Sequence, residues 1–221
     1  MATATVGAES ATLATADDRR GKVSLVDPFC AVTHFVAELD RWLRARGASG
    51  LDAEHLEAAP GTSGAEVPAS VQAWFAETSV RALATLPALA GVVAALADLV
   101  PSLDWYKRPS DGSDAVFDDG HFNAIVVGDA GLASMGQVLI GVSLMARGVS
   151  YPVHRHPPDE CYLVLSPGEW WREDDGWWTP GIGNLVYNAG NQLHAMRAGA
   201  ESHLSVWVLQ GQGAAGFSPG S

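Results

Sequence analysis

The stretch YPVHRHPPDECYLV, residues 151–164, holds two histidines, a glutamate and two tyrosines within one short segment. In an extended chain, successive side chains point to opposite faces. One face then collects the even-numbered residues His154, His156, Glu160 and Tyr162. The other face becomes purely apolar as the segment runs into CYLVLS. This pattern predicts a strand of a β-sheet with chemistry on one face and core packing on the other.

Two prolines interrupt this segment. Pro157 and Pro158 predict a bend, so that the histidine pair and the Glu/Tyr pair lie on either side of it. Arg155 falls on the opposite parity from the histidines and is expected to face solvent. Cys161 is expected to pack in the core for the same reason.

Imidazole and carboxylate groups together favour divalent transition metals of the first row. A third imidazole is expected from His194, because the preceding segment NAGNQL predicts a tight turn that can bring it beside the first cluster. We therefore predict a divalent metal cofactor, with Fe, Mn, Zn, Ni and Co all compatible with the ligands. The predicted ligands are His154, His156, Glu160 and His194.

The composition limits the classes of function. The chain has 221 residues, of which 48% are hydrophobic, and a formal net charge of −12. Such acidity disfavours nucleic acids and anionic membranes as partners. The most apolar segment, residues 82–97, has 16 residues and includes Pro87, which is short of the roughly 20 residues that a membrane span needs. With no signal-peptide pattern at the N-terminus, we expect a cytoplasmic protein.

The chain changes character near residue 110. Residues 1–24 are expected to form a mobile tail, residues 25–110 a helical portion, and residues 111–221 a β-barrel or sandwich, so that the fold class is α+β. The helical patterns run from Asp27 to Gly47, from Val67 to Leu86 with an apolar side of Val71, Trp74, Phe75 and Val80, and from Pro87 to Leu99. The segment KRPSDGSDAVFDDG is expected to be a turn-rich linker. The strand patterns are HFNAIVVGD, QVLIGVSLMA, CYLVLS, GEWWRE, GWWTPG, NLVYN and HLSVWVLQ.

These residues resemble the cupin superfamily over roughly residues 115–215. Gly148, His154, His156 and Glu160 match its first motif, G-x5-H-x-H-x3-E, although the glycine that should follow is displaced to Gly168. The segment from Gly183 to His194 matches the second motif in part. The usual proline and glycine of the turn in that motif are replaced by Ala189 and Asn191, and Asn tolerates the left-handed conformation that the turn requires. The resemblance implies a cupin β-barrel.

A narrower resemblance is to the cupin-type dimethylsulfoniopropionate lyases. It rests on Tyr151 before the first histidine and Tyr162 after the glutamate, and that family is also similar in carrying helices before its barrel. The resemblance implies metal-dependent β-elimination of a zwitterionic small molecule to dimethyl sulfide and acrylate. It also implies that Tyr162 is the catalytic base and that Tyr151 helps to form the substrate pocket. A homodimer is an expectation that no residue pattern supports.

A sulfonium substrate also requires a site for its cation. Aromatic faces attract such cations, and among the tryptophans of the barrel half we expect Trp207 and Trp178 to bind substrate. His121 and His203 are expected to be either exposed or structural. Two other functions remain open: another metal-dependent cupin enzyme, such as a dioxygenase or isomerase, or a cupin that binds a small molecule without turnover.

Overall fold

The computed structural model describes residues 27–48, 50–59 and 66–211. The expected tail, residues 1–24, lies outside this part of the chain. The described elements mix helices and sheets, so the α+β prediction is confirmed. No helix within the described ranges is both long and apolar enough to cross a membrane.

The first helix follows the local signals of its sequence. The Asp27 carboxylate accepts a hydrogen bond from the Phe29 N–H at 2.8 Å, and Pro28 occupies the first helical position. The expected apolar stripe, which includes Phe35 and Leu39, is buried. The helices are α1 (Pro28–Arg44), α2 (Ala69–Thr85), α3 (Ala90–Leu99) and α4 (Ala115–Gly120), with short 3-10 turns at Ala53–His55, Pro87–Leu89 and Val100–Ser102.

The prediction is wrong for one residue of the apolar side of α2. Val80 is 70% exposed, whereas Val71, Phe75, Thr78 and Ala82 are buried. The buried positions recur at a spacing of three and four residues, which places them on one helical face, and Val80 falls off that face. The buried stripe therefore includes the small polar Thr78, whose hydroxyl donates to the Trp74 carbonyl at 2.8 Å.

The strands form two sheets. The larger sheet has the order β1-β3-β2-β4-β11-β6-β9, and the smaller has the order β5-β10-β7-β8. The strands are β1 (Glu57–Ala58), β2 (His121–Val127), β3 (Ala133–Ser134), β4 (Val138–Met145), β5 (Ser150–His154), β6 (Asp159–Val164), β7 (Glu169–Arg172), β8 (Gly176–Trp178), β9 (Leu185–Asn188), β10 (His194–Arg197) and β11 (His203–Gln210). Short β1 comes from the helical portion and pairs with β3, so that portion contributes to the sheet.

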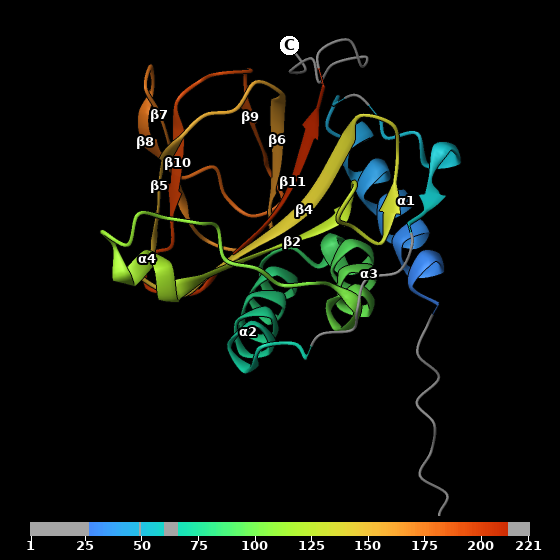
Figure 1. The fold of residues 1–221 in the computed structure, drawn as a ribbon, viewed down its shortest axis with the longest axis horizontal. Helices are drawn as coiled ribbons and strands as arrows, with labels where there is room; N and C mark the ends of the chain where they lie inside the picture. The colour runs from blue at the N-terminus through green and yellow to red at the C-terminus, as the bar shows by residue number, and fades with distance from the viewer. Residues whose placement is uncertain (1–26, 49, 60–65, 212–221) are drawn as a thin grey trace, which may run out of the picture.

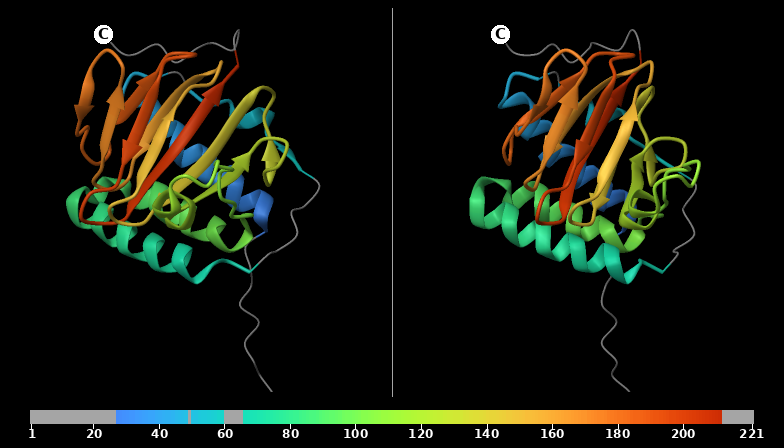
Figure 2. Two further views of the ribbon diagram at one scale, coloured as in Figure 1. Left: turned by 60° about the vertical axis from the view of Figure 1, so that its left-hand side comes forward. Right: turned by 90° about the vertical axis from the view of Figure 1, so that its left-hand side faces the viewer.

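The molecule has three layers. Helices α1, α2 and α3 lie on one side of the larger sheet, and the smaller sheet lies on the other side (Figures 1 and 2). On β11, Val206 and Val208 join the core cluster that includes the helices, whereas Trp207 joins the cluster between the two sheets. Tyr162 of the opening segment belongs to the same cluster as Trp207, so the polar face of that segment points into the space between the sheets.

The predicted linker contains a short helix. The Asp114 carboxylate caps α4 by accepting hydrogen bonds from the N–H groups of Val116 and Phe117, both at 3.0 Å. Phe117 is 2% exposed and packs in the inter-sheet cluster. A segment rich in turn residues therefore also contains one buried aromatic residue, which packs the helix against the barrel.

The helical portion is attached to the barrel by specific contacts. The Trp42 indole N–H donates to the Gly183 carbonyl at 3.0 Å, just before β9. Gly183 has a φ of 83°, and a Cβ atom there would meet Leu86 at 2.4 Å. The second cupin-like motif thus begins at a glycine that is held against α1.

Candidate metal centre and pocket

Strand pairing brings together two of the predicted ligands from distant parts of the sequence. Strands β5 and β10 are antiparallel, and His194 is the Cα partner of His154. The imidazole rings of these residues lie 4.2 Å apart between centroids. His156 follows in the bend after β5, and its ring lies 5.1 Å from that of His194.

The turn before His194 is attached to the bend after β5. Asn191 has a φ of 64°, so the expected left-handed conformation is confirmed, and its N–H donates to the His156 carbonyl at 2.7 Å. The Gly190 N–H donates to the Asp159 carboxylate at 2.7 Å. A Cβ atom on Gly190 would lie 2.3 Å from the Pro157 carbonyl oxygen, so this close approach requires glycine.

Backbone carbonyls fix the tautomers of all three histidines. The Nδ1–H groups donate to the carbonyls of residues 152, 158 and 192, at 2.9, 3.0 and 2.8 Å for His154, His156 and His194. Each neutral ring therefore carries its lone pair on Nε2. One ring nitrogen from each histidine lies within 4.8 Å of the others.

Glu160 completes the cluster from β6. One of its carboxylate oxygens lies 3.2 Å from Nε2 of His156 and 3.0 Å from Nε2 of His194, and its other contact is with the Asn188 amide at 3.3 Å. Burial alone would raise the pKa of this carboxyl group, but His156 and His194 lower it to about 2 when they carry a proton on Nε2, through their hydrogen bonds and charge. A cation held by the neutral rings would act in the same direction. Glu160 is therefore an anion inside the protein.

These four side chains fit a divalent metal. Three imidazole lone pairs and a carboxylate converge, and the buried Nε2 atoms of His156 and His194 face the Glu160 carboxylate without a well-formed hydrogen bond. Electron-rich groups that face one another repel unless a cation lies between them. Backbone carbonyls on the opposite ring nitrogens are the usual outer support of histidine ligands.

A cavity of about 270 Å³ opens beside this cluster. Three of the remaining predicted residues, Tyr151, Tyr162 and Trp207, line it. Trp178 is not among its lining residues; it lies on β8, where the Arg172 guanidinium is 4.6 Å from the centroid of its ring. Arg155 is exposed at the rim of the cavity, as expected.

Tyr162 is next to the predicted ligands and directly opposite Trp207. The two residues are Cα partners on β6 and β11, and both are nearly buried. Burial raises the pKa of the Tyr162 phenol well above its usual value, and the Glu160 carboxylate raises it further. Without added positive charge nearby, Tyr162 is therefore a neutral phenol.

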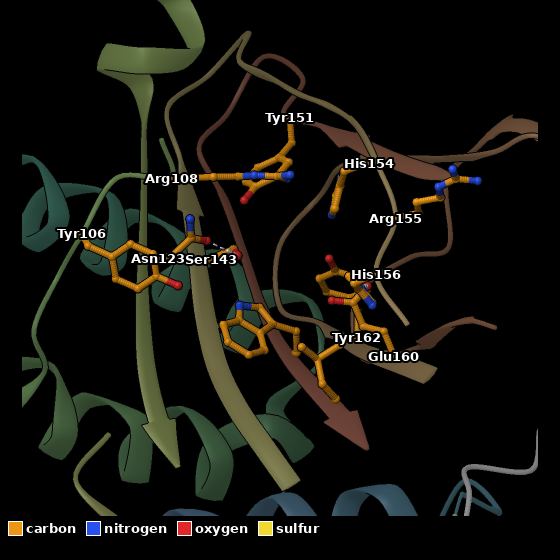
Figure 3. A pocket seen from close by; sticks show the side chains of 12 residues that line it. Tyr106, Arg108, Asn123, Ser143, Tyr151, His154, Arg155, His156, Glu160 and Tyr162 are labelled. Atoms are coloured by element: carbon orange, nitrogen blue, oxygen red, sulfur yellow. Dashed lines mark hydrogen bonds and ion pairs between the residues drawn. The ribbon is translucent and has the colours of Figure 1, made fainter. Parts of the chain in front are cut away.

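Tyr151 has a different environment. Burial also raises the pKa of its phenol, but the neighbouring Arg108 guanidinium and the Asn123 amide counteract the increase. The side-chain oxygen of Asn123, Oδ1, in turn accepts a hydrogen bond from the Ser143 hydroxyl at 2.6 Å (Figure 3). A polar network thus orients Tyr151 from the side of the cavity remote from Glu160.

Sequence reasoning missed this second side of the pocket. Tyr106, Arg108, Asn123 and Ser143 all line the cavity. Arg108 lies in the segment expected to be a linker, and the two short polar residues lie in runs interpreted as core strands. Only Asn123 and Ser143 had a sequence signal, because polar residues at buried positions of apolar strands are unusual.

The two remaining barrel histidines are structural. His121 and His203 are both 0% exposed, so the alternative of solvent exposure is wrong. Each uses Nδ1 for a backbone carbonyl, that of Phe117 for His121 and that of Pro167 for His203. They lie at the ends of strands, where these bonds satisfy carbonyls outside the sheet ladder.

The sequence matches the protein family described as dimethylsulfoniopropionate lyase over residues 54–205, which is more than half of the chain. The chain belongs to this family. The match begins within the helical portion and includes every predicted ligand, so it covers both the barrel and part of what precedes it. A comparison with curated proteins gives no match.

Two solved structures described as dimethylsulfoniopropionate lyases share the fold. DddQ from Ruegeria pomeroyi DSS-3, described as a dimethylsulfoniopropionate lyase, is 23% identical with a TM-score of 0.65, over 89% of this chain and 100% of that one. A structure from a study of the lyases RdDddP and RnDddQII is 19% identical with a TM-score of 0.65, over 85% of this chain and 95% of that one. These two structures confirm the predicted arrangement of helices followed by a β-fold.

Proposed function

We propose that this family member is a metal-dependent lyase that cleaves dimethylsulfoniopropionate to dimethyl sulfide and acrylate. The observation that carries the proposal is the convergence of three Nε2 lone pairs and an ionised carboxylate beside a buried tyrosine. His154, His156, Glu160 and His194 would hold the metal. Family membership supports the choice of substrate.

The reaction is a β-elimination. The Tyr162 oxygen takes the proton from the carbon next to the substrate carboxylate, the electron pair forms the carbon–carbon double bond, and the bond to sulfur breaks with its electrons leaving on dimethyl sulfide. A divalent metal in this site would supply the positive charge that stabilises negative charge on the substrate carboxylate and favours the phenolate of Tyr162. Tyr162 is close to the ligands, since Glu160 precedes it by two residues on the same face of β6.

The other end of the substrate carries a sulfonium cation. Trp207 lines the cavity and offers an aromatic face, which attracts a cation by about 0.5–2 kcal/mol. Its indole lies against Gly141, where a Cβ atom would be only 2.0 Å from the ring. Tyr151 borders the same cavity and would orient the substrate.

The test is the release of dimethyl sulfide and acrylate by metal-loaded protein, by chelated protein and by Tyr162→Phe. We expect equal amounts of the two products from the loaded protein and a decrease of about 10²–10⁴-fold for Tyr162→Phe, because a positioned base contributes that much. Tyr187→Phe is the matched control, since Tyr187 is partly buried, packs against the core cluster under the helices and does not line the cavity.

The outcomes separate the main alternatives. A loaded protein that binds metal but releases no dimethyl sulfide would overturn the proposed reaction, and oxygen uptake would then identify a dioxygenase. Full activity in Tyr162→Phe would overturn only the assignment of the base.

A further inference from the structure

Two arginines line the cavity, and they differ in direction. Figure 3 shows the Arg108 side chain extending into the cavity toward Tyr151, whereas the Arg155 side chain extends away from it. The guanidinium carbon of Arg108 lies 5.4 Å from the centroid of the Tyr151 ring. Arg108 is therefore the fixed positive charge that faces the interior of the pocket.

The backbone of Arg108 is held in place. Its N–H donates to Nε2 of His121 at 2.8 Å, and the His121 ring is buried and stacked on Phe117 at 3.8 Å between centroids. Two residues earlier, Tyr106 exchanges both backbone hydrogen bonds with Asn123, each at 2.8 Å. Side chains alternate in this extended segment, so Tyr106 and Arg108 both face the cavity.

Arg108 has no carboxylate partner among the described residues. Five of the eight other arginines in the described ranges pair with a carboxylate: Arg41 with Glu38, Arg44 with Asp40, Arg81 with Glu201, Arg172 with Asp175, and Arg197 with Glu169. The acidic group of the pocket, Glu160, is already engaged by two histidines. A partly buried guanidinium without an anion is unfavourable, and its planar fork of donors matches a carboxylate.

We propose that Arg108 binds the carboxylate of the substrate and makes the pocket selective for small molecules with an anionic end. The assignment rests on the proposed function for the identity of the substrate. A carboxylate has two oxygens, so one can accept hydrogen bonds from the guanidinium while the other faces the predicted metal ligands. Like charges repel, so the sulfonium must lie away from Arg108, and Trp207 is the tryptophan among the lining residues that can receive it.

The experiment separates the two ends of the substrate. Metal-loaded protein is titrated calorimetrically with propionate, which has the carboxylate alone, and with tetramethylammonium, which has a cation alone. For Arg108→Met we expect the dissociation constant for propionate to rise by about 10- to 100-fold, because a hydrogen-bonded charged pair is lost. The constant for tetramethylammonium should be unchanged or lower. Arg147→Met is the matched control, because Arg147 is exposed and does not line the cavity, and it should bind both ligands as the unmodified protein does.

Kinetics and a second variant complete the test. With dimethylsulfoniopropionate, Arg108→Met should raise KM by about the same factor and change kcat less. Arg108→Gln, which keeps a polar side chain beside Tyr151, carries the same expectation if the methionine variant melts early. Unchanged propionate affinity in a folded variant, or an equal loss for both probes, overturns the assignment. A third outcome is that propionate binds and its binding depends on Arg108, but the protein releases no dimethyl sulfide. That result would overturn the proposed reaction and leave the assignment of Arg108 intact.

Discussion

The two faces of the larger sheet differ in what their side chains do. On the face toward the helices, Leu163 and Val206 are 1% and 0% exposed and belong to the large apolar cluster. On the inner face, their immediate neighbours Tyr162 and Trp207 line the cavity. The main hydrophobic core therefore lies between the larger sheet and the helices, whereas the space between the two sheets holds the candidate site. Because side chains alternate along each strand, neighbouring residues serve different purposes: one packs in the core and the next lines the cavity.

The largest effect is expected on the inner face, at Glu160. Glu160→Gln removes the buried negative charge that faces two histidines, and we expect dimethyl sulfide release to decrease by about 10³-fold, or about 4 kcal/mol in the activation free energy. Metal content, measured by mass spectrometry after dialysis, should decrease with it. Glu169→Gln on β7 is the control, because that carboxylate pairs with Arg197 and does not line the cavity. A Glu160→Gln protein with full metal content and full activity would contradict the proposed ligand set.

An effect of a different kind, on stability and not on activity, is expected on the outer face, at Leu163. Leu163→Ala leaves a cavity in the core under the helices, and we expect the free energy of unfolding to decrease by about 2–5 kcal/mol. The kcat of the folded protein should change by no more than a few fold. Denaturant unfolding and product release on the same sample measure both quantities. A loss of activity as large as that of Glu160→Gln would show that the two faces are not independent.

The smallest effect concerns a histidine of the inner face that has no predicted part in metal binding. Burial lowers the pKa of His203 from its usual 6.5 to about 4. Between these values the unfolded chain binds a proton that the folded protein does not, so the contribution of His203 to stability decreases as pH falls below 6.5 and levels off below 4. Between pH 7 and 5 this amounts to about 2 kcal/mol.

The measurement compares unfolding of the unmodified protein and His203→Gln at several pH values. The unmodified protein should lose about 2 kcal/mol more than the variant between pH 7 and 5. Parallel pH profiles would show that the neutral state of His203 does not limit acid stability.

Local regularity explains what could be predicted. The even-numbered residues of the opening segment do share the cavity face, and the bend at Pro157–Pro158 separates β5 from β6 as expected. Asn191 adopts the left-handed conformation that its turn requires. Each of these predictions depends on residues that are close in sequence, or on a motif that links two such segments.

The missed features depend on contacts between distant segments. Arg108 reaches the pocket because Tyr106 pairs with Asn123 and because His121 accepts its backbone N–H, and no periodicity in the linker indicates either bond. Trp178 lies on a strand with the correct composition and packs against the cluster between the sheets, but it does not reach the lining of the cavity. Which side of a barrel a tryptophan faces is decided by tertiary pairing and not by residue type.

The pairing of Tyr162 with Trp207 has a consequence for how this family can vary. Because the two residues are Cα partners on adjacent strands, a single-residue insertion within β11 would turn Trp207 toward the helices and bring a neighbouring valine into the cavity. Such an insertion would therefore reduce both the stability of the fold and the turnover of substrate. Divergence should therefore accumulate as substitutions at constant strand length and as changes in loop length, while insertions inside β6 or β11 are eliminated.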